Sequence, residues 1–264
     1  MTFQITILGC GSSGGVPRVG GDWGACDPAH PKNRRRRCSI LVERFTGDQK
    51  TVVLVDTSPD LREQLLAAGV TRLDGILLTH AHADHVHGID DVRPLVIKMK
   101  RRIGAYMDHP TSELVLSRFS YIFQTPPGSQ YPPLLDPFAL EPASPCSIKG
   151  PGGAISALPF RLEHGDMDAL GFRFGDVAYT PDLKSVPEES FEALEGLDIW
   201  IIDALRYTSH PSHLSIAEAL ELISRMRPKR AILTNLHTDV DFERLRAELP
   251  KNIEPAYDGM QIRF

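Results

Sequence analysis

The chain has 264 residues, of which 42% are hydrophobic and 24% are charged, as in ordinary soluble globular proteins. Its 29 lysines and arginines against 34 aspartates and glutamates give a net charge of −5, which does not favour binding to nucleic acid or to an anionic membrane. The first residues begin a strand pattern without a basic leader, and no apolar run reaches the roughly 18–20 residues of a membrane helix. We therefore expect a cytoplasmic protein, with residues 1–264 as a single domain.

The first strand pattern, Phe3–Leu8, runs into the glycine-rich segment Gly9–Gly15. This segment contains G-x-G-x-x-G, but a dinucleotide-binding turn needs a helix that opens at its last glycine. Val16–Gly21 follows instead, and its proline and two glycines prevent a clean helix start. We reject a dinucleotide site. The glycines either serve backbone geometry alone or bring the loop close to a functional site, where Ser12 and Ser13 would donate to a phosphate.

Four consecutive arginines, Arg34–Arg37, stand before the next strand pattern, Ser39–Val42. Such a run is usually a solvated face, and it also suits the attraction of an anionic substrate. We take Arg36 as the arginine that would contact this substrate.

A further strand pattern, Thr51–Val55, ends at Asp56. An aspartate at a strand end is well placed to hydrogen-bond a metal-ligating histidine. The residues that follow predict a helix through Ala68, with Ser58 as its N-cap and Pro59 at its first position.

Four potential metal ligands fall within six residues, directly after the apolar run Ile76–Leu78. Imidazole suits zinc, manganese and related ions, and a carboxylate adds a harder oxygen. His80 and His82 would hold one ion at the end of the strand, and Asp84 and His85, one turn further on, would hold a second. Two adjacent cations can activate a water and hold both oxygens of a displacement at phosphorus.

The middle of the chain is less regular. A strand is predicted over Ile103–Tyr106 and an amphipathic helix over Ser112–Phe123. Residues 125–153 are crowded with proline and glycine, so we expect an insertion with no regular element, which acts either as a lid or as a long connector.

The run His-x-His-x-Asp-His after an apolar strand resembles the signature of the metallo-β-lactamase superfamily. Its extension from Thr79 to Arg93 is similar to the cyclic-phosphodiesterase branch, which includes the phosphoribosyl cyclic phosphate phosphodiesterases and is related to the tRNA 3′-processing ribonuclease, tRNase Z. The resemblance covers nearly the whole chain. It implies an α/β fold, the four-layer αβ/βα sandwich of that superfamily.

The resemblance also implies the remaining metal ligands. His164, at the end of a strand pattern, would complete the first site, and Asp182 would bridge both ions with one oxygen to each. Relatives commonly have histidine directly after the threonine that ends the strand Ala231–Thr234, where this chain has Asn235. We expect His237 to complete the second site instead, because two residues along an extended segment keep the same side. The choice between His237 and Asn235 stays open.

His213 matches the catalytic histidine segment of the branch and precedes a helix that Ser215 and Glu218 would cap. Since it is not needed as a ligand, we expect it to protonate the leaving oxygen as a general acid, a role worth about 10²–10⁴-fold in rate. Capping or substrate positioning is the alternative role for His213, and His210 is the fallback acid.

The resemblance thus implies a binuclear hydrolase in which a metal-bridging hydroxide attacks a small cyclic or nucleotide-like phosphodiester and Asp84 orients that hydroxide. Two divalent ions, zinc or manganese, are the expected cofactors, and homodimers are common among relatives. A tRNA 3′-processing ribonuclease is the second hypothesis, disfavoured because the insertion supplies no basic arm for tRNA phosphates. The third is a metal-binding biosynthetic accessory protein without hydrolytic activity, against which the presence of His213 argues.

Overall fold

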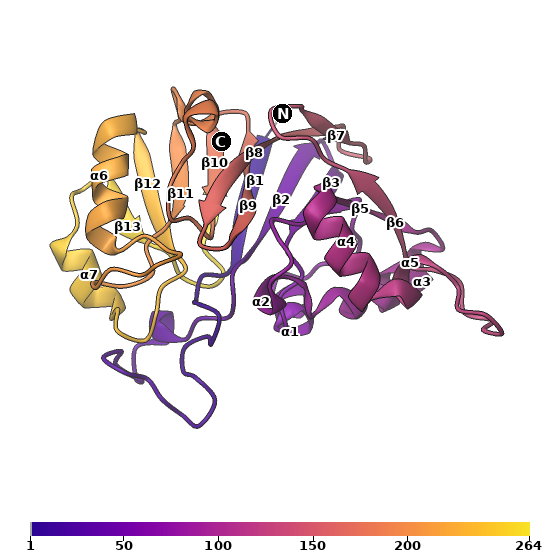
Figure 1. Cartoon of the computed structure of the whole chain (residues 1–264), viewed down its shortest axis with the longest axis horizontal. Coiled ribbons are helices and arrows are strands. Elements are labelled where there is room, and N and C mark those ends of the chain that lie inside the picture. Colours follow the sequence, from indigo (N-terminus) through magenta and orange to yellow (C-terminus); the bar gives the residue numbers. More distant parts are fainter. Residues whose placement is uncertain (1) are drawn as a thin grey trace.

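The computed structural model describes residues 2–264 and contains two seven-stranded sheets that face each other (Figure 1). The strand order of the first sheet is β14-β1-β2-β3-β4-β5-β6, and that of the second is β13-β12-β11-β10-β9-β8-β7. The strands of the first sheet are β1 (Thr2–Gly9), β2 (Ser39–Thr46), β3 (Gln49–Val55), β4 (Gly75–Leu77), β5 (Ile103–Met107), β6 (Leu135–Ala139) and β14 (Gln261–Arg263). Those of the second are β7 (Cys146–Ile148), β8 (Ile155–His164), β9 (Met167–Phe174), β10 (Val177–Thr180), β11 (Ile199–Asp203), β12 (Arg230–Thr234) and β13 (Ile253–Pro255).

Helices cover the outer face of each sheet, which confirms the predicted four-layer sandwich (Figure 1). Outside the first sheet lie α1 (Leu61–Ala67), α2 (Ala83–Val86), α3 (Arg93–Met99), α4 (His109–Arg118) and α5 (Ser120–Phe123). Outside the second lie α6 (Ile216–Met226) and α7 (Phe242–Glu248). Three short 3₁₀ segments are η1 (Pro31–Asn33), η2 (Ile89–Val92) and η3 (Glu188–Leu194). No helix among residues 2–264 is both long enough and apolar enough to cross a membrane.

The side chains of each sheet divide into an inner and an outer layer, because successive residues of a strand point to opposite faces. Val53 and Val55 of β3 join the central core between the sheets, while Leu54 packs beneath the helices of the first half. In β11, Ile201 faces the same central core and Trp200 packs under the helices of the second half. Both sheets are therefore buried on both faces, which explains their continuous apolar runs.

The expectation that residues 125–153 form no regular element is wrong. This stretch contributes β6 to the edge of the first sheet and β7 to the edge of the second, and Ile148 is buried in the central core. Pro137 lies within β6, and proline is tolerated there because an edge strand needs fewer ladder hydrogen bonds. The segment is thus a connector between the two sheets.

Two helix boundaries also differ from the prediction. The first helix begins at Leu61 with Asp60 as its N-cap, because the hydroxyl of Ser58 binds Gln64 and accepts from the amide of Asp60 inside a preceding turn. The predicted helix over residues 112–123 begins earlier, where Asp108 caps α4, and it breaks at Phe119 before α5. The predicted capping box of Ser215 and Glu218 is confirmed at the start of α6.

One relationship positions the functional residues. In the first sheet, β3 and β4 are parallel. In the second sheet, β10, β11 and β12 are parallel to one another. β8 runs in the same direction as β10, because β9 lies between them and is antiparallel to both. Parallel strands have their carboxyl ends at one edge of a sheet, so loops after all six strands can meet there. Asp56, Asp203 and Asn235 stand at the ends of three of these strands, β3, β11 and β12.

Candidate metal centre

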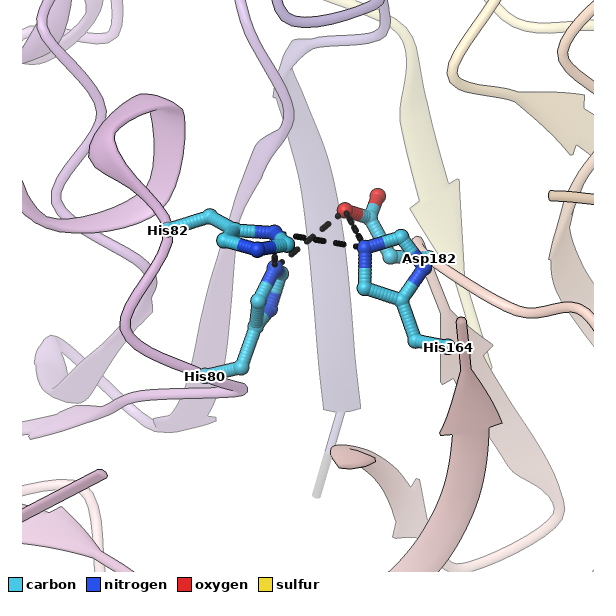
Figure 2. Close-up of side chains that lie close together, drawn as sticks. All are labelled: His80, His82, His164 and Asp182. Carbon is cyan, nitrogen blue, oxygen red and sulfur yellow. Dashed lines mark hydrogen bonds and ion pairs between the residues drawn. The ribbon is translucent and has the colours of Figure 1, made fainter. Parts of the chain in front are cut away.

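Four side chains from three separate segments converge in the first ligand group (Figure 2). His80 and His82 follow β4, His164 ends β8, and Asp182 follows β10. One donor atom from each lies within 4.8 Å of all the others. Nε2 of His80 lies 2.9 Å and Nε2 of His164 lies 3.3 Å from Nδ1 of His82. Three nitrogens and one carboxylate oxygen form the tetrahedral donor set that zinc prefers in proteins.

Asp84, His85 and the same Asp182 form a second group within the same distance limit. Oδ2 of Asp182 lies 3.1 Å from Nε2 of His85, 3.4 Å from Nε2 of His80 and 3.6 Å from Nε2 of His164. A single carboxylate oxygen therefore faces both groups. The structure brings together six of the seven predicted ligands.

Asp56 contacts Nδ1 of His85, whereas the other ring nitrogen, Nε2, lies near Asp182. Oδ2 of Asp56 lies 2.7 Å from Nδ1 of His85, and Asp56 also accepts hydrogen bonds from the amide and the hydroxyl of Thr79. Asp56 adopts a positive φ of 65°, a conformation that aspartate tolerates better than most residues, and its side chain is fully buried. Because Nδ1 of His85 is occupied, Nε2 is left to face a cation. The predicted hydrogen bond between Asp56 and a histidine of this run is confirmed, while metal binding by His85 stays a prediction.

Burial and neighbouring charges shift the pKa values of the side chains in this cluster. Burial lowers the pKa of His80 well below its usual value and also lowers the pKa of His164, so both rings are neutral at pH 7. Although burial opposes both shifts, the charges of Asp182, Asp56 and Asp84 raise the pKa of His85 well above its usual value, and the charge of His85 in turn holds the pKa of Asp182 well below its usual value. His85 would therefore release a proton when it binds an ion. Neutral imidazoles and ionised carboxylates are the forms that bind metal, and these donor sets fit zinc or manganese.

His213 lies beside the first group and is paired with a carboxylate. Its Nδ1 lies 2.8 Å from Oδ2 of Asp203, and its ring centroid lies 4.6 Å from that of His164. Asp203 is fully buried and also accepts a hydrogen bond from the amide of Leu183 at 3.0 Å. His213 therefore stands next to the ligands without belonging to either group.

His237 is the predicted ligand that the structure does not bring into either group. The guanidinium of Arg18 donates to its Nε2, and its Nδ1 lies 3.3 Å from Oδ2 of Asp239. The prediction assumed an extended segment after β12, but Asn235 has a positive φ of 61° and turns the chain. A left-handed residue ends the two-residue alternation of a strand, so His237 leaves the side on which Asn235 lies.

Asn235 itself lies in the centre. Its Nδ2 donates to Oδ1 of Asp182 at 3.1 Å and to Oδ1 of Asp203 at 3.3 Å. Sequence reasoning missed Asp203 altogether, although this aspartate directly follows the apolar run Ile199–Ile202. The strand-end pattern that identified Asp56 would have found it.

The three predicted substrate-binding residues, Ser12, Ser13 and Arg36, differ in their exposure and in their distance from the centre. Ser12 is 4% exposed, and its hydroxyl has no hydrogen-bond partner among residues 2–264. Its amide donates to the carbonyl of Leu236, beside Asn235. Ser13 is exposed to solvent. Arg36 is held away by Asp258, which accepts from both its backbone amide and its Nε at 2.9 Å. Ser12 is the one of the three whose contacts lie next to the centre.

A cavity of about 450 Å³ adjoins His80 between the start of α4 and the hairpin of β8 and β9. Its lining includes Asp108, Glu141, Asp166 and Asp168. A volume of this size suits a small molecule.

Comparisons with known proteins agree with this geometry. The Beta-lactamase superfamily domain family matches residues 51–235. The crystal structure of a diphosphatase from the PhnP family superposes with a TM-score of 0.89 at 34% identity, and the match covers 100% of this chain and 98% of that one.

Two curated relatives are longer proteins. An octanoyltransferase of Porphyromonas gingivalis is 34% identical over 264 residues, which cover 98% of this chain and 51% of that protein. A ribonuclease Z of Bradyrhizobium is 32% identical over 149 residues, 54% of this chain and 46% of that protein. The chain thus spans about half the length of these curated relatives.

The resemblance read from the His-x-His-x-Asp-His run is confirmed by the match over residues 51–235 and by the PhnP-family structure. The chain belongs to the β-lactamase superfamily domain family and has the metallo-β-lactamase fold.

Proposed function

We propose that the protein is a metal-dependent phosphodiesterase with a binuclear centre, which acts on a small cyclic or nucleotide-like phosphodiester. The observation that carries this proposal is the convergence of both ligand groups on Oδ2 of Asp182, with the His213–Asp203 pair beside them. His80, His82, His164 and Asp182 would hold one ion, and Asp84 and His85 would hold a second together with Asp182. Bound zinc or manganese would supply Lewis acidity and an activated water.

The remaining chemistry belongs to the side chains. His213 would donate a proton from Nε2 to the departing alkoxide, because Asp203 holds its Nδ1. Asp84, whose side chain is 19% exposed, would orient the attacking water. Asp203 has no contact with the reacting atoms in this scheme and positions the acid.

A cationic cluster near the centre supports an anionic substrate. Arg18 contacts His237, and after burial the charges of Arg18 and Arg206 are among the causes that lower the pKa of His237. The guanidinium of Arg206 donates to the carbonyls of Thr208 and Ser209, directly before His210. Burial, the charge of His213 and then the charge of Arg206 lower the pKa of His210. His210 and His213 are themselves 5.1 Å apart between ring centroids. Arg18 and Arg206 would attract a phosphodiester to the mouth of the site.

The relatives support phosphorus chemistry, since one solved structure is that of a diphosphatase and one curated relative is a ribonuclease. A small substrate is favoured over tRNA, because residues 125–153 carry one lysine against an aspartate and a glutamate and so offer no basic arm.

The test is turnover of bis(p-nitrophenyl) phosphate by zinc- and manganese-loaded protein, beside Asp84→Ala and His213→Ala. We expect a metal-dependent rate that is lost in Asp84→Ala. Because p-nitrophenolate leaves without a proton, the fall of about 10²–10⁴-fold expected in His213→Ala is measured on a cyclic nucleotide, whose leaving group is an alkoxide. Cyclic nucleotides, nucleoside diphosphates and a tRNA precursor form the second panel. If the loaded, folded protein hydrolyses none of them, the proposal is wrong; if it cleaves only the tRNA precursor, the ribonuclease reading replaces it.

A further inference from the structure

We infer that Asn235 makes the two metal sites unequal, so that the protein keeps one ion tightly and exchanges the other. The tight site is that of His80, His82, His164 and Asp182, and the exchangeable site is that of Asp84, His85 and Asp182. The inference concerns metal binding and depends on the ligand groups of the proposed function, not on which substrate is cleaved.

The two groups differ in the number and kind of their donors. The first offers three imidazole nitrogens and one carboxylate oxygen, a complete tetrahedral set. Among residues 2–264, the second offers one imidazole and two carboxylates, and one of these, Asp182, is shared with the first. Only Asp84 and His85 belong to the second site alone.

Asn235 stands beside Asp182, at the position where relatives commonly have a histidine, but its amide directs its NH₂ group toward Asp182. Nδ2 faces Oδ1 of Asp182 at 3.1 Å and Oδ1 of Asp203 at 3.3 Å, while Oδ1 of Asn235 lies 4.0 Å from the buried thiol of Cys38. An amide NH₂ group carries two hydrogens and has no lone pair to offer a cation.

The orientation of this amide is set by its neighbours. If the amide turned over, its oxygen would face the two carboxylates Asp182 and Asp203, and both hydrogen bonds would be lost. Leaving buried acceptors unpaired costs far more than the alternative contact with a thiol returns. Nδ2 therefore stays on the side of the carboxylates.

The same hydrogen bond restricts Asp182. Since its Oδ1 is held by Asn235, Oδ2 alone faces both ligand groups. Two ions would have to share this single oxygen instead of taking one oxygen each. Two like charges so close repel each other, and the site with fewer donors of its own loses more affinity.

His237 does not compensate for the missing donor. The positive φ of Asn235 turns the chain, and Nε2 of His237 accepts from the guanidinium of Arg18. Its Nδ1 is on the side of Asp239. A ring held between a guanidinium and a carboxylate is not available to the second ion in this arrangement.

The donor types also separate the two sites. Three imidazoles favour zinc at the first site, whereas a site of two carboxylates and one imidazole is harder and accepts manganese or magnesium. The exchangeable site should therefore bind whichever divalent ion the buffer supplies, while the tight site retains its zinc.

The experiment measures metal content directly. Protein loaded with excess zinc is passed through metal-free buffer, and retained metal per chain is measured by plasma mass spectrometry, while calorimetric titration gives the affinity of each step. We expect one retained ion in the wild type and a second step at least about 100-fold weaker than the first. His82→Ala, which removes a donor of the tight site, should lose the retained ion.

Asn235→His adds the absent donor and should tighten the second step about tenfold or more, so that nearly two ions are retained. If that variant does not fold by circular dichroism, Asn235→Asp supplies an anionic donor from the same position. His237→Ala is the matched control and should leave both steps unchanged. Two equally tight ions in the wild type, an unchanged second step in the folded Asn235 variants, or a second step weakened by His237→Ala would each overturn the inference. If the wild type binds no zinc, the proposed function is wrong as well, because it needs the metal centre. If the wild type binds two ions tightly, only the inference about unequal sites is wrong.

Discussion

Nδ1 of His213 lies 2.8 Å from Oδ2 of Asp203, and this contact couples the two ionisations. Although burial opposes it, the charge of Asp203 and the hydrogen bond to it raise the pKa of His213 to about 9. Burial raises the pKa of Asp203 to about 6. Between about pH 6 and pH 9 the pair is therefore an imidazolium beside a carboxylate, and His213 carries the proton that a leaving alkoxide needs.

The first prediction concerns the pH profile of hydrolysis. His213 is protonated below its raised pKa, so kcat should decline as pH rises through about 9. Asp203→Asn removes the charge that raises this pKa, and the alkaline limb should shift to lower pH. The profile of kcat for a cyclic nucleotide, whose leaving group is an alkoxide, measures the shift, with circular dichroism as the folding control. If the alkaline limb does not move in Asp203→Asn, His213 is not the general acid.

The second prediction concerns Asp56, which orients His85 through a 2.7 Å contact. Asp56→Asn keeps the shape of the side chain and loses its charge, so the ring of His85 is less firmly held and less basic. We expect metal affinity at the site of Asp84 and His85 to fall about 10–100-fold, as is usual when a partner of a ligand histidine is changed. Calorimetric titration with manganese measures it. Asp60→Asn, on the same loop but paired with Arg37, is the control and should leave the affinity unchanged.

The parts of the site that sequence predicted well are those set by local spacing. His80, His82, Asp84 and His85 lie within six residues, so their convergence needs only a strand end and one helical turn. His164 and Asp182 stand at or just after strand ends in the other sheet, and the resemblance to a known family joined them to the first four. The continuous apolar runs likewise predicted β1, β2, β3, β4 and β5 of the first sheet.

The failures share a different cause. Asparagine tolerates the left-handed conformation better than most residues, but the residue type alone does not show that Asn235 adopts it, so an extended continuation led to His237. Residues 125–153 were judged by their prolines, but β6 and β7 are edge strands whose partners lie far away in the sequence. Both features depend on tertiary contacts that composition does not contain.

The third prediction concerns Arg206. Arg206→Gln removes a cation next to His210 and also the hydrogen bonds of Arg206 to the carbonyls of Thr208 and Ser209, while both ligand groups keep their residues. We expect KM for bis(p-nitrophenyl) phosphate to rise about tenfold with little change in kcat, the size of one lost charge-assisted contact. The difference should shrink at high ionic strength, because salt screens exposed charges. Arg62→Gln, an exposed arginine on α1, is the matched control; an equal rise in KM there would show that only net charge matters.

The last prediction tests the loop that carries Asp56. The amide of Gly88 donates to the carbonyl of Thr57, and a Cβ at Gly88 would lie 2.0 Å from the carbonyl oxygen of Ser58. Because this neighbour is backbone, Gly88→Ala must displace residues 57–58, which lie directly after Asp56. We expect a loss of about 1–3 kcal/mol in the free energy of unfolding, together with weaker metal binding.

Gly104→Ala is the matched control for this change. A Cβ at Gly104 would meet the ring of Tyr106 at 2.9 Å and that of Phe138 at 3.0 Å, and both are side chains that can move aside. Phe138 is 47% exposed, so its displacement costs little packing. Thermal and urea unfolding with and without zinc compare the two variants. Equal losses in both, with metal affinity retained in Gly88→Ala, would show that the approach of Gly88 to Ser58 does not support the ligand loop.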